Sequence, residues 1–133
     1  MDLSRLASTF VVVTPELRCA AEPLRSSLYG DLDAAYDGFR GCLLVAEHTF
    51  TADWATWEVH PKGDELLYLL EGSCTLHLAS AAGREEVPFT EPGSVVRVPA
   101  GVWHTAKVRE RCRILFITPG EGTRNTPEPE GMD

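Results

Sequence analysis

Side chains that bind metals and anions gather in the stretch HPKGDELLYLLEG, residues 60–72. His60, Lys62 and an acidic pair ending at Glu65 precede an apolar run that closes at Gly72. Imidazole and carboxylate groups are ligands for divalent ions, whereas an ammonium group binds carboxylates and phosphates. The stretch therefore offers two kinds of chemistry, metal binding and anion binding.

The strand before this stretch has two different faces. On an extended chain Glu58, His60 and Lys62 fall on one face, while Trp57 and Val59 fall on the other. The apolar face can pack against a second sheet. The polar face then points either to solvent or into an internal cavity, and this strand alone leaves both possibilities open.

A second histidine-bearing stretch is PGSVVRVPAGVWH, residues 92–104. Its order is Gly93, five residues, Pro99, one residue, Gly101, two residues and His104. This order resembles the second signature of the cupin superfamily, Gly-x5-Pro-x-Gly-x2-His.

The first stretch resembles the other cupin signature, His-x-His-x3,4-Glu-x6-Gly. His60 takes the first histidine place, Glu65 the carboxylate place and Gly72 the closing place. The sequence departs from the family at two positions. Lys62 stands where the second histidine belongs, with only two residues between it and Glu65, and Val108 stands where the family has asparagine. The resemblance spans about residues 54–108.

The resemblance implies an all-β fold, a double-stranded β-helix or jelly-roll barrel of two antiparallel sheets, with the ligands pointing into its mouth. It implies a metal site formed by His60, Glu65 and His104. Two imidazoles and one carboxylate suit Fe, Mn, Ni or Zn and leave coordination positions open.

Lys62 divides the functional hypotheses. Its long side chain can leave the barrel mouth, so that a three-ligand metal site remains. Alternatively the ammonium group can stay inside, replace the charge of the metal and bind a small anionic metabolite. As a third possibility, His60 and His104 line a residual pocket that binds no metal.

Two further residues are candidates for ligand binding or for support of the ligands. Glu58 shares a strand face with His60 and is a spare carboxylate, or else a solvated strand residue. Trp103 directly precedes His104, and shapes the pocket if it is not simply packing. His48 and His77 are interpreted as structural residues.

The elements that must position these residues are short strands. Eight apolar or alternating segments separated by Gly, Pro and Asp are typical of a sandwich or barrel, and crossover helices are lacking. The segments are CLLVAEHTF, WATWEVHP, ELLYLLEG, CTLHLAS, EEVPFTEPG, SVVRVPAG, WHTAKVRE and RILFITPG.

The expected organisation has three parts. Residues 1–40 contain a strand that ends at Pro15, expected at a sheet edge, and at most one or two short helices, the best within residues 26–39. Residues 41–118 form the barrel. Residues 119–133 are a loop followed by a disordered tail that takes in the last ten residues.

Composition excludes several partners. Twenty acidic and twelve basic residues give a formal charge of -8, which disfavours nucleic acids and anionic membrane surfaces. The N-terminus lacks a long apolar run, so a cytoplasmic location is expected. Four separated cysteines are interpreted as small buried thiols.

The leading functional hypothesis is a single-domain cupin that binds a divalent transition metal and a small molecule. If it is an enzyme, it acts on a small oxygenated substrate in a dioxygenase, isomerase or decarboxylase reaction. The alternative is a metal-free barrel that binds an anionic metabolite through Lys62 without catalysis. A homodimer formed through an edge strand is also expected.

Overall fold

The computed structural model describes residues 4–129 and confirms an all-β fold built from two antiparallel sheets and one short helix. The elements are β1 (Thr9–Val13), β2 (Cys19–Pro23), α1 (Leu28–Ala35), β3 (Leu43–Phe50), β4 (Trp57–Val59), β5 (Glu65–Gly72), β6 (Cys74–Ser80), β7 (Gly83–Phe89), β8 (Val95–Val98), β9 (Trp103–Lys107), β10 (Cys112–Pro119) and β11 (Arg124–Thr126).

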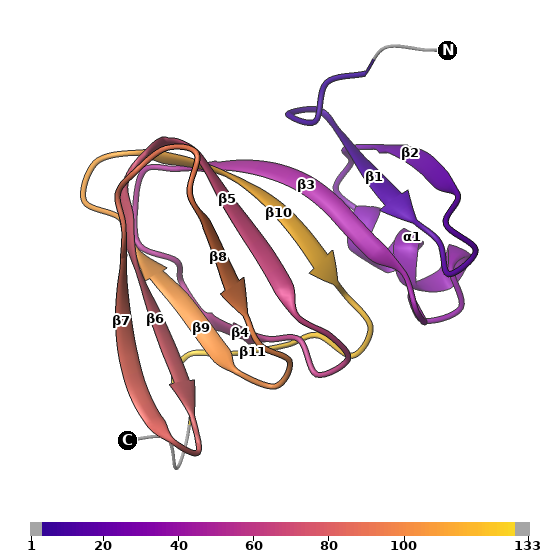
Figure 1. Cartoon of the computed structure of the whole chain (residues 1–133). Helices are drawn as coiled ribbons and strands as arrows, with labels where there is room; N and C mark the ends of the chain where they lie inside the picture. Colours follow the sequence, from indigo (N-terminus) through magenta and orange to yellow (C-terminus); the bar gives the residue numbers. More distant parts are fainter. Residues whose placement is uncertain (1–3, 130–133) are drawn as a thin grey trace.

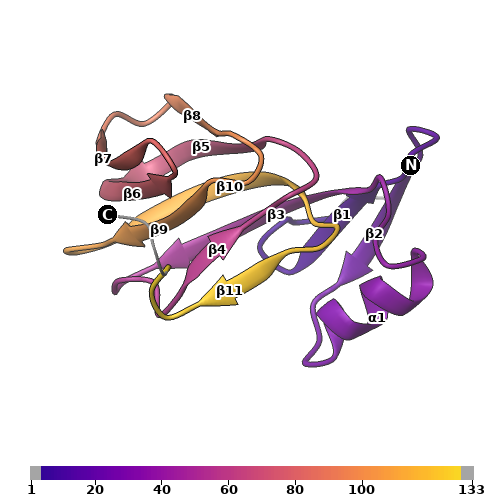
Figure 2. The same ribbon diagram turned by 90° about the horizontal axis from the view of Figure 1, so that it is seen from below.

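The two sheets form two layers, as Figure 2 shows. The six-stranded sheet has the order β2-β1-β3-β10-β5-β8, and the five-stranded sheet has the order β11-β4-β9-β6-β7. Neighbours in these orders are mostly distant in sequence, as in a jelly roll. Each of the eight predicted strand segments overlaps a strand of the barrel.

The alternation of β5 shows how the sequence fills the barrel. Glu65, Leu67 and Leu69 are buried on one face, whereas Leu66 and Tyr68 on the other face are about two-fifths exposed. Glu65 therefore begins the row of side chains that points into the barrel. The carboxylate is held at the end of an apolar row.

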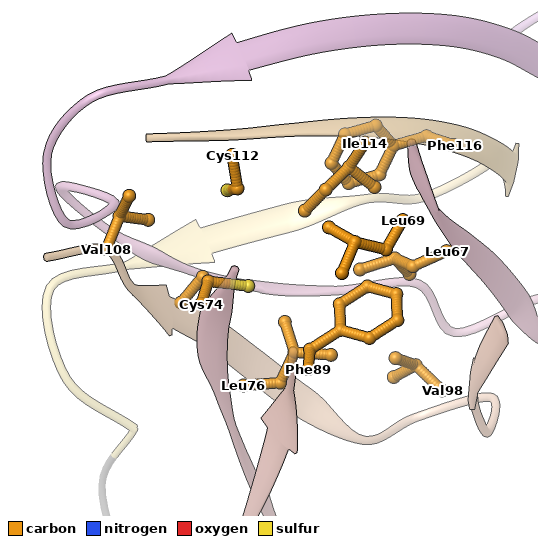
Figure 3. Packing of buried hydrophobic residues seen from close by; sticks show 11 residues of the cluster. Leu67, Leu69, Cys74, Leu76, Phe89, Val98, Val108, Cys112, Ile114 and Phe116 are labelled. Carbon is orange, nitrogen blue, oxygen red and sulfur yellow. The ribbon is translucent and has the colours of Figure 1, made fainter. Parts of the chain in front are cut away.

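The main core lies between the two sheets (Figure 3). β5 and β10 contribute to it from one sheet and β6 and β9 from the other, so the strands that carry the candidate ligands also carry the core. Its buried members are Leu67, Leu69, Cys74, Leu76, Phe89, Val98, Ala106, Val108, Cys112, Ile114 and Phe116.

A second apolar cluster joins the N-terminal elements to β3. In Figure 1, β1, β2 and α1 lie at one end of the molecule, beyond the barrel, and β3 runs from them into it. Leu28 and Leu32, one helical turn apart on α1, are buried with Phe10 and Val12 of β1. The predicted helix is thus present, and its apolar face packs on the sheet.

Two expectations about the N-terminal part were wrong. β1 is not an edge strand, because it pairs with β2 on one side and with β3 on the other, and the edge is β2, which was not predicted. The segment CAAEP has too few β-branched or aromatic residues to be recognised as a strand. Cys19 on β2 is exposed, although the other three cysteines are buried as expected.

The C-terminal segment is more ordered than its composition suggested. Residues 124–126 form β11, which pairs with β4 in the register Arg124 to Val59, Asn125 to Glu58 and Thr126 to Trp57. The disordered tail expected from residue 124 onward was therefore wrong for this strand, because backbone pairing with β4 compensates for its polar sequence. Residues 130–133 lie outside the described residues.

Within residues 4–129, no helix is both long enough and apolar enough to cross a bilayer.

Gly72, which closes the first motif, is required by the backbone geometry. Its φ of +74° lies in the left-handed region, and a Cβ atom there would collide with the carbonyl oxygen of Arg111. This close approach lets β5 turn into β6 beside the start of β10. The glycine is therefore structural and does not contribute a ligand.

Substitution of Gly72 should destabilise the fold. We expect Gly72→Ala to lower the free energy of unfolding by at least about 2 kcal/mol, because it combines left-handed strain with a backbone clash. The matched control is Gly30→Ala in α1, where the added Cβ meets no atom within 4 Å. The control should be neutral or stabilising by up to about 1 kcal/mol. Denaturant unfolding of both variants decides, and equal stability of the two would contradict the structure.

Candidate functional site

Four polar side chains from both sheets meet inside the barrel. Glu58 lies on β4, His60 directly follows that strand, Glu65 begins β5 and His104 lies on β9. Glu58 and His104 are directly paired across β4 and β9, so their side chains share one face of the sheet. The structure thus brings together His60, Glu65 and His104, as the sequence predicted, and adds Glu58.

The carboxylate of Glu65 lies between the two imidazoles. Its Oε1 is 2.9 Å from Nε2 of His104, and its Oε2 is 3.3 Å from Nε2 of His60. All three side chains are at most 5% exposed. The Oε2 of Glu58 is 3.9 Å from Nε2 of His60, and one ligand atom each of Glu58, His60 and His104 lies within 4.8 Å of the others.

Hydrogen bonds on the far side of His60 fix its tautomer. The hydroxyl of Thr123 donates to the carbonyl of Gly120 at 2.9 Å, so this oxygen must accept from Nδ1 of His60, 2.8 Å away. A neutral imidazole protonated at Nδ1 has its lone pair on Nε2. The lone pair of His60 therefore faces the Glu65 carboxylate.

His104 has the same arrangement. Its Nδ1 lies 3.3 Å from the carbonyl oxygen of Val102, which can only accept, so Nδ1 carries the hydrogen. Nε2 of His104 is again the lone-pair atom. Support of one ring nitrogen by a backbone or hydroxyl oxygen, with the other nitrogen free, is usual for histidines that bind metals.

The atoms that face one another have no hydrogen-bond partners. Nε2 of His60, Nε2 of His104 and Oε1 of Glu65 are buried and make no hydrogen bond of normal geometry, even though His104 and Glu65 approach to 2.9 Å. Buried polar atoms without partners are costly. Three lone-pair atoms that converge without a shared hydrogen fit a site for a cation.

The titration of these groups shows what a proton does in the place of a cation between these atoms. Burial by itself raises the pKa of Glu65, but the imidazoles of His104 and His60 outweigh it and lower this pKa to about 2. Burial lowers the pKa of His104, and the Glu65 carboxylate reverses this and raises it. Burial, followed by the charge of Glu65, raises the pKa of Glu58. The group of four is thus short of positive charge.

Thr118 on β10 holds the second oxygen of the central carboxylate. Its hydroxyl donates to Oε2 of Glu65 at 2.5 Å. Thr118 follows Phe116 on the inward-facing row of β10. Neither Thr118 nor Thr123 was recognised from the sequence, because a threonine on a strand or in a loop carries no distinguishing pattern.

A cavity of about 890 Å³ opens beside the four residues. Glu58, His60 and Glu65 line it, together with residues of α1, of β3 and the loop that follows it, and of the segment after β10. The N-terminal elements therefore do more than extend the sheet, because α1 closes one side of the cavity.

Lys62 lies away from this cavity. β4 ends at Val59, and Pro61 and the turn after it break the alternation that would have placed Lys62 on the same face as His60. Lys62 is exposed and lines a separate small cavity of about 280 Å³, beside Asp64 and Glu121. The structure gives it no place among the ligands.

The pocket tryptophan differs from the expected one. The Trp103 ring has the guanidinium of Arg124 over it at 5.7 Å, and Trp103 is not among the residues that line the large cavity within positions 4–129. Trp54 lines the cavity instead, with its ring 6.1 Å from that of His104. Trp54 lies in a loop, where alternation along a strand could not assign its direction.

Glu58 is the site residue that the motif comparison undervalued. The family motif allows three or four residues between its second histidine and the carboxylate. With four residues before Glu65, the place of the second histidine falls on His60. Glu58 then takes the first ligand place, and the motif becomes Glu-x-His-x4-Glu-x6-Gly. This alternative spacing was the signal in the sequence, and the geometry favours it over the one that used Lys62.

Comparison with known proteins supports the fold. The family model for the cupin domain matches residues 49–118. A search of curated proteins gave no match.

Three solved structures are similar at low identity. The Bacillus subtilis oxalate decarboxylase, described with Mn(II) centres, has a TM-score of 0.53 and 19% identity over 63% of this chain and 23% of its own. A cupin protein from Bacteroides fragilis has a TM-score of 0.51 and 14% identity over 60% of this chain and 67% of its own. A cupin superfamily protein from Desulfitobacterium hafniense has a TM-score of 0.48 and 22% identity over 57% and 65%. At these identities the likeness to the first two of these structures shows the fold alone.

Two histidine substitutions separate the two alignments of the motif. We expect Glu58→His to raise the affinity for Ni(II) relative to Mn(II) by about tenfold, because imidazole nitrogen replaces carboxylate oxygen in the cluster. Lys62→His should change neither affinity, since its side chain lies outside the cavity. Both are measured by titrating metal-stripped protein against a fluorescent chelator. Tighter binding in Lys62→His, with no change in Glu58→His, would contradict the assignment.

Proposed function

This chain belongs to the cupin family, and we propose that its barrel binds a divalent transition-metal ion through His60, Glu65 and His104, with Glu58 as a fourth ligand. The observation that carries the proposal is the convergence of two imidazole Nε2 atoms on a buried carboxylate, while an oxygen atom engages the Nδ1 atom of each ring. Two neutral imidazoles and carboxylate oxygens form a donor set for Fe, Mn, Ni or Zn.

The remaining residues of the site hold the ligands in place. Thr123 and the Val102 carbonyl keep the Nδ1 hydrogens of the two histidines, so that both Nε2 atoms stay available. Thr118 holds one oxygen of Glu65 and leaves Oε1 free. This set of hydrogen bonds prepares the donor atoms before any ion arrives.

We propose that a small oxygenated molecule binds in the adjoining cavity, and that the reaction is of the dioxygenase, isomerase or decarboxylase type. A bound ion would supply Lewis acidity or activate dioxygen there. The cavity of about 890 Å³ is within the usual size range for small-molecule sites. Its position beside Glu58, His60 and Glu65 puts the ligand next to the metal-binding atoms.

The alternative, a metal-free barrel that binds an anion through Lys62, has less support. Lys62 lines a different cavity. Among the residues within 4–129 that line the large cavity, there is no lysine or arginine, whereas four are acidic. An anion would therefore enter a negatively charged space without a metal to compensate. The homodimer and the cytoplasmic location remain predictions.

Metal content tests the proposal. Protein purified without a metal-binding tag should contain close to one divalent transition metal per chain, read by mass spectrometry. His60→Ala and His104→Ala should each lower metal affinity by at least about a hundredfold, since each removes a buried ligand.

The matched control is His77→Ala. His77 is a half-buried histidine of β6 that lies 3.9 Å from Glu86 on the adjacent strand. Its removal should leave the metal content unchanged. Circular dichroism of all variants checks the fold. A wild-type protein that holds no metal and binds no added Fe, Mn, Ni or Zn would refute the proposal.

A further inference from the structure

The charge of the large cavity is strongly acidic. Asp33, Asp53, Glu58 and Glu65 line it, and no lysine or arginine does so within residues 4–129. A bound divalent ion offsets two of these four charges, and two remain. The chain as a whole carries a formal charge of -8, so its surroundings do not reverse the sign.

The two carboxylates away from the metal ligands are available to a ligand. Asp33 lies on α1 and is exposed, and no ion pair is formed by it within residues 4–129. Asp53 accepts a hydrogen bond from the backbone of Val108 through Oδ1 at 2.7 Å, and Oδ2 is 3.9 Å from Lys107. That last pair is half exposed and therefore weak.

A continuous aromatic wall forms another side of the same cavity. It consists of His48, Phe50, Trp54 and Phe116, all of which line the cavity. The ring centroids of Phe50 and Trp54 are 5.2 Å apart, and Phe116 lies 6.0 Å and 5.9 Å from them. Such a wall binds flat rings by stacking and attracts cations through its π faces.

This wall reaches the candidate ligands. The Trp54 ring lies 6.1 Å from that of His104, and His60 presents an unpartnered buried nitrogen at the same cavity. Tyr29 of α1 also lines this cavity and is 63% exposed, so its ring is available to contact a bound molecule. Aromatic surface and negative charge thus border one space.

We propose that this cavity takes an organic cation with an aromatic ring, such as an oxygenated arylalkylamine, in preference to a carboxylate or phosphate. The inference rests on the proposed function in taking the metal ion and the ligand to share this cavity. The ring packs against Phe50, Trp54 and Phe116, and the ammonium group lies near Asp33 or Asp53. Specificity then comes from the charge that the metal leaves uncompensated.

Three probes of similar size and different charge test this. They are 2-phenylethylamine, 2-phenylethanol and 3-phenylpropionate, each titrated by calorimetry into metal-loaded and metal-stripped protein at low and high salt. We expect the amine to bind at least about tenfold more tightly than 3-phenylpropionate, with the alcohol between them and the preference weaker at high salt. Metal content is measured on the same samples.

A double variant and a matched control locate the charge. Asp33→Asn combined with Asp53→Asn should reduce the preference for the amine at least about threefold, and an asparagine at 53 can still accept the Val108 hydrogen bond. The control is Asp37→Asn, an equally charged and highly exposed residue just after α1 that does not line the cavity. It should leave the preference unchanged.

The outcomes separate this inference from the proposed function. Tightest binding of 3-phenylpropionate, or binding of none of the three probes, overturns the inference even if metal is present. The inference is also overturned if the amine is preferred only when the ion is present and the double variant keeps this preference. The amine would then ligate the metal directly. If the protein holds no metal and still prefers the amine, the cavity inference stands and the proposed function fails.

Discussion

The buried carboxylate of Glu65 is the constraint around which the barrel is organised. An ionised side chain that is only 2% exposed costs several kcal/mol of desolvation unless partners compensate for it. Thr118 donates to one oxygen of Glu65, and a proton or a cation held between the carboxylate and the imidazoles of His104 and His60 compensates for the remaining charge. These partners come from β10, from β9 and from the chain after β4. The two sheets must therefore close around Glu65 for the carboxylate to be tolerated.

That closure also determines what the site can bind. Because the Nδ1 hydrogens of both histidines are engaged elsewhere, the interior presents lone pairs and negative charge with no matching hydrogens. Such an arrangement suits a cation. The tautomers of two histidines, set by a threonine hydroxyl and a backbone carbonyl, thus connect the fold to the proposed metal chemistry.

The sequence predicted the barrel well because each strand has its own apolar row, as β5 shows with Leu67 and Leu69. It failed where the positions depend on pairing or on the path of the chain: the polar β11 is a strand because β4 pairs with it, and Lys62 leaves the site because Pro61 and a turn follow β4. The grouping of His60, Glu65 and His104 was predicted from the resemblance to the family motifs. Glu58 was ranked below them because the motif was aligned with two residues, and not four, between its second histidine place and Glu65.

The parts of the chain outside the matched family region give this cupin its own cavity. Residues before position 49, including Tyr29 and Asp33 of α1, and residues after 118, including Thr123, line the space beside the ligands. The barrel supplies the proposed metal site, and these additions shape what reaches it. Differences in ligand among proteins with this fold can arise in this way without any change to the barrel.

The most direct test of the central claim is a crystal structure of the metal-loaded protein with anomalous diffraction recorded at the absorption edge of the ion. We expect a single strong anomalous peak about 2.0–2.3 Å from Nε2 of His60, Nε2 of His104 and a Glu65 oxygen, with Glu58 turned toward it. An ion bound elsewhere, or no peak at this position with Lys62 turned into the cavity, would contradict the account.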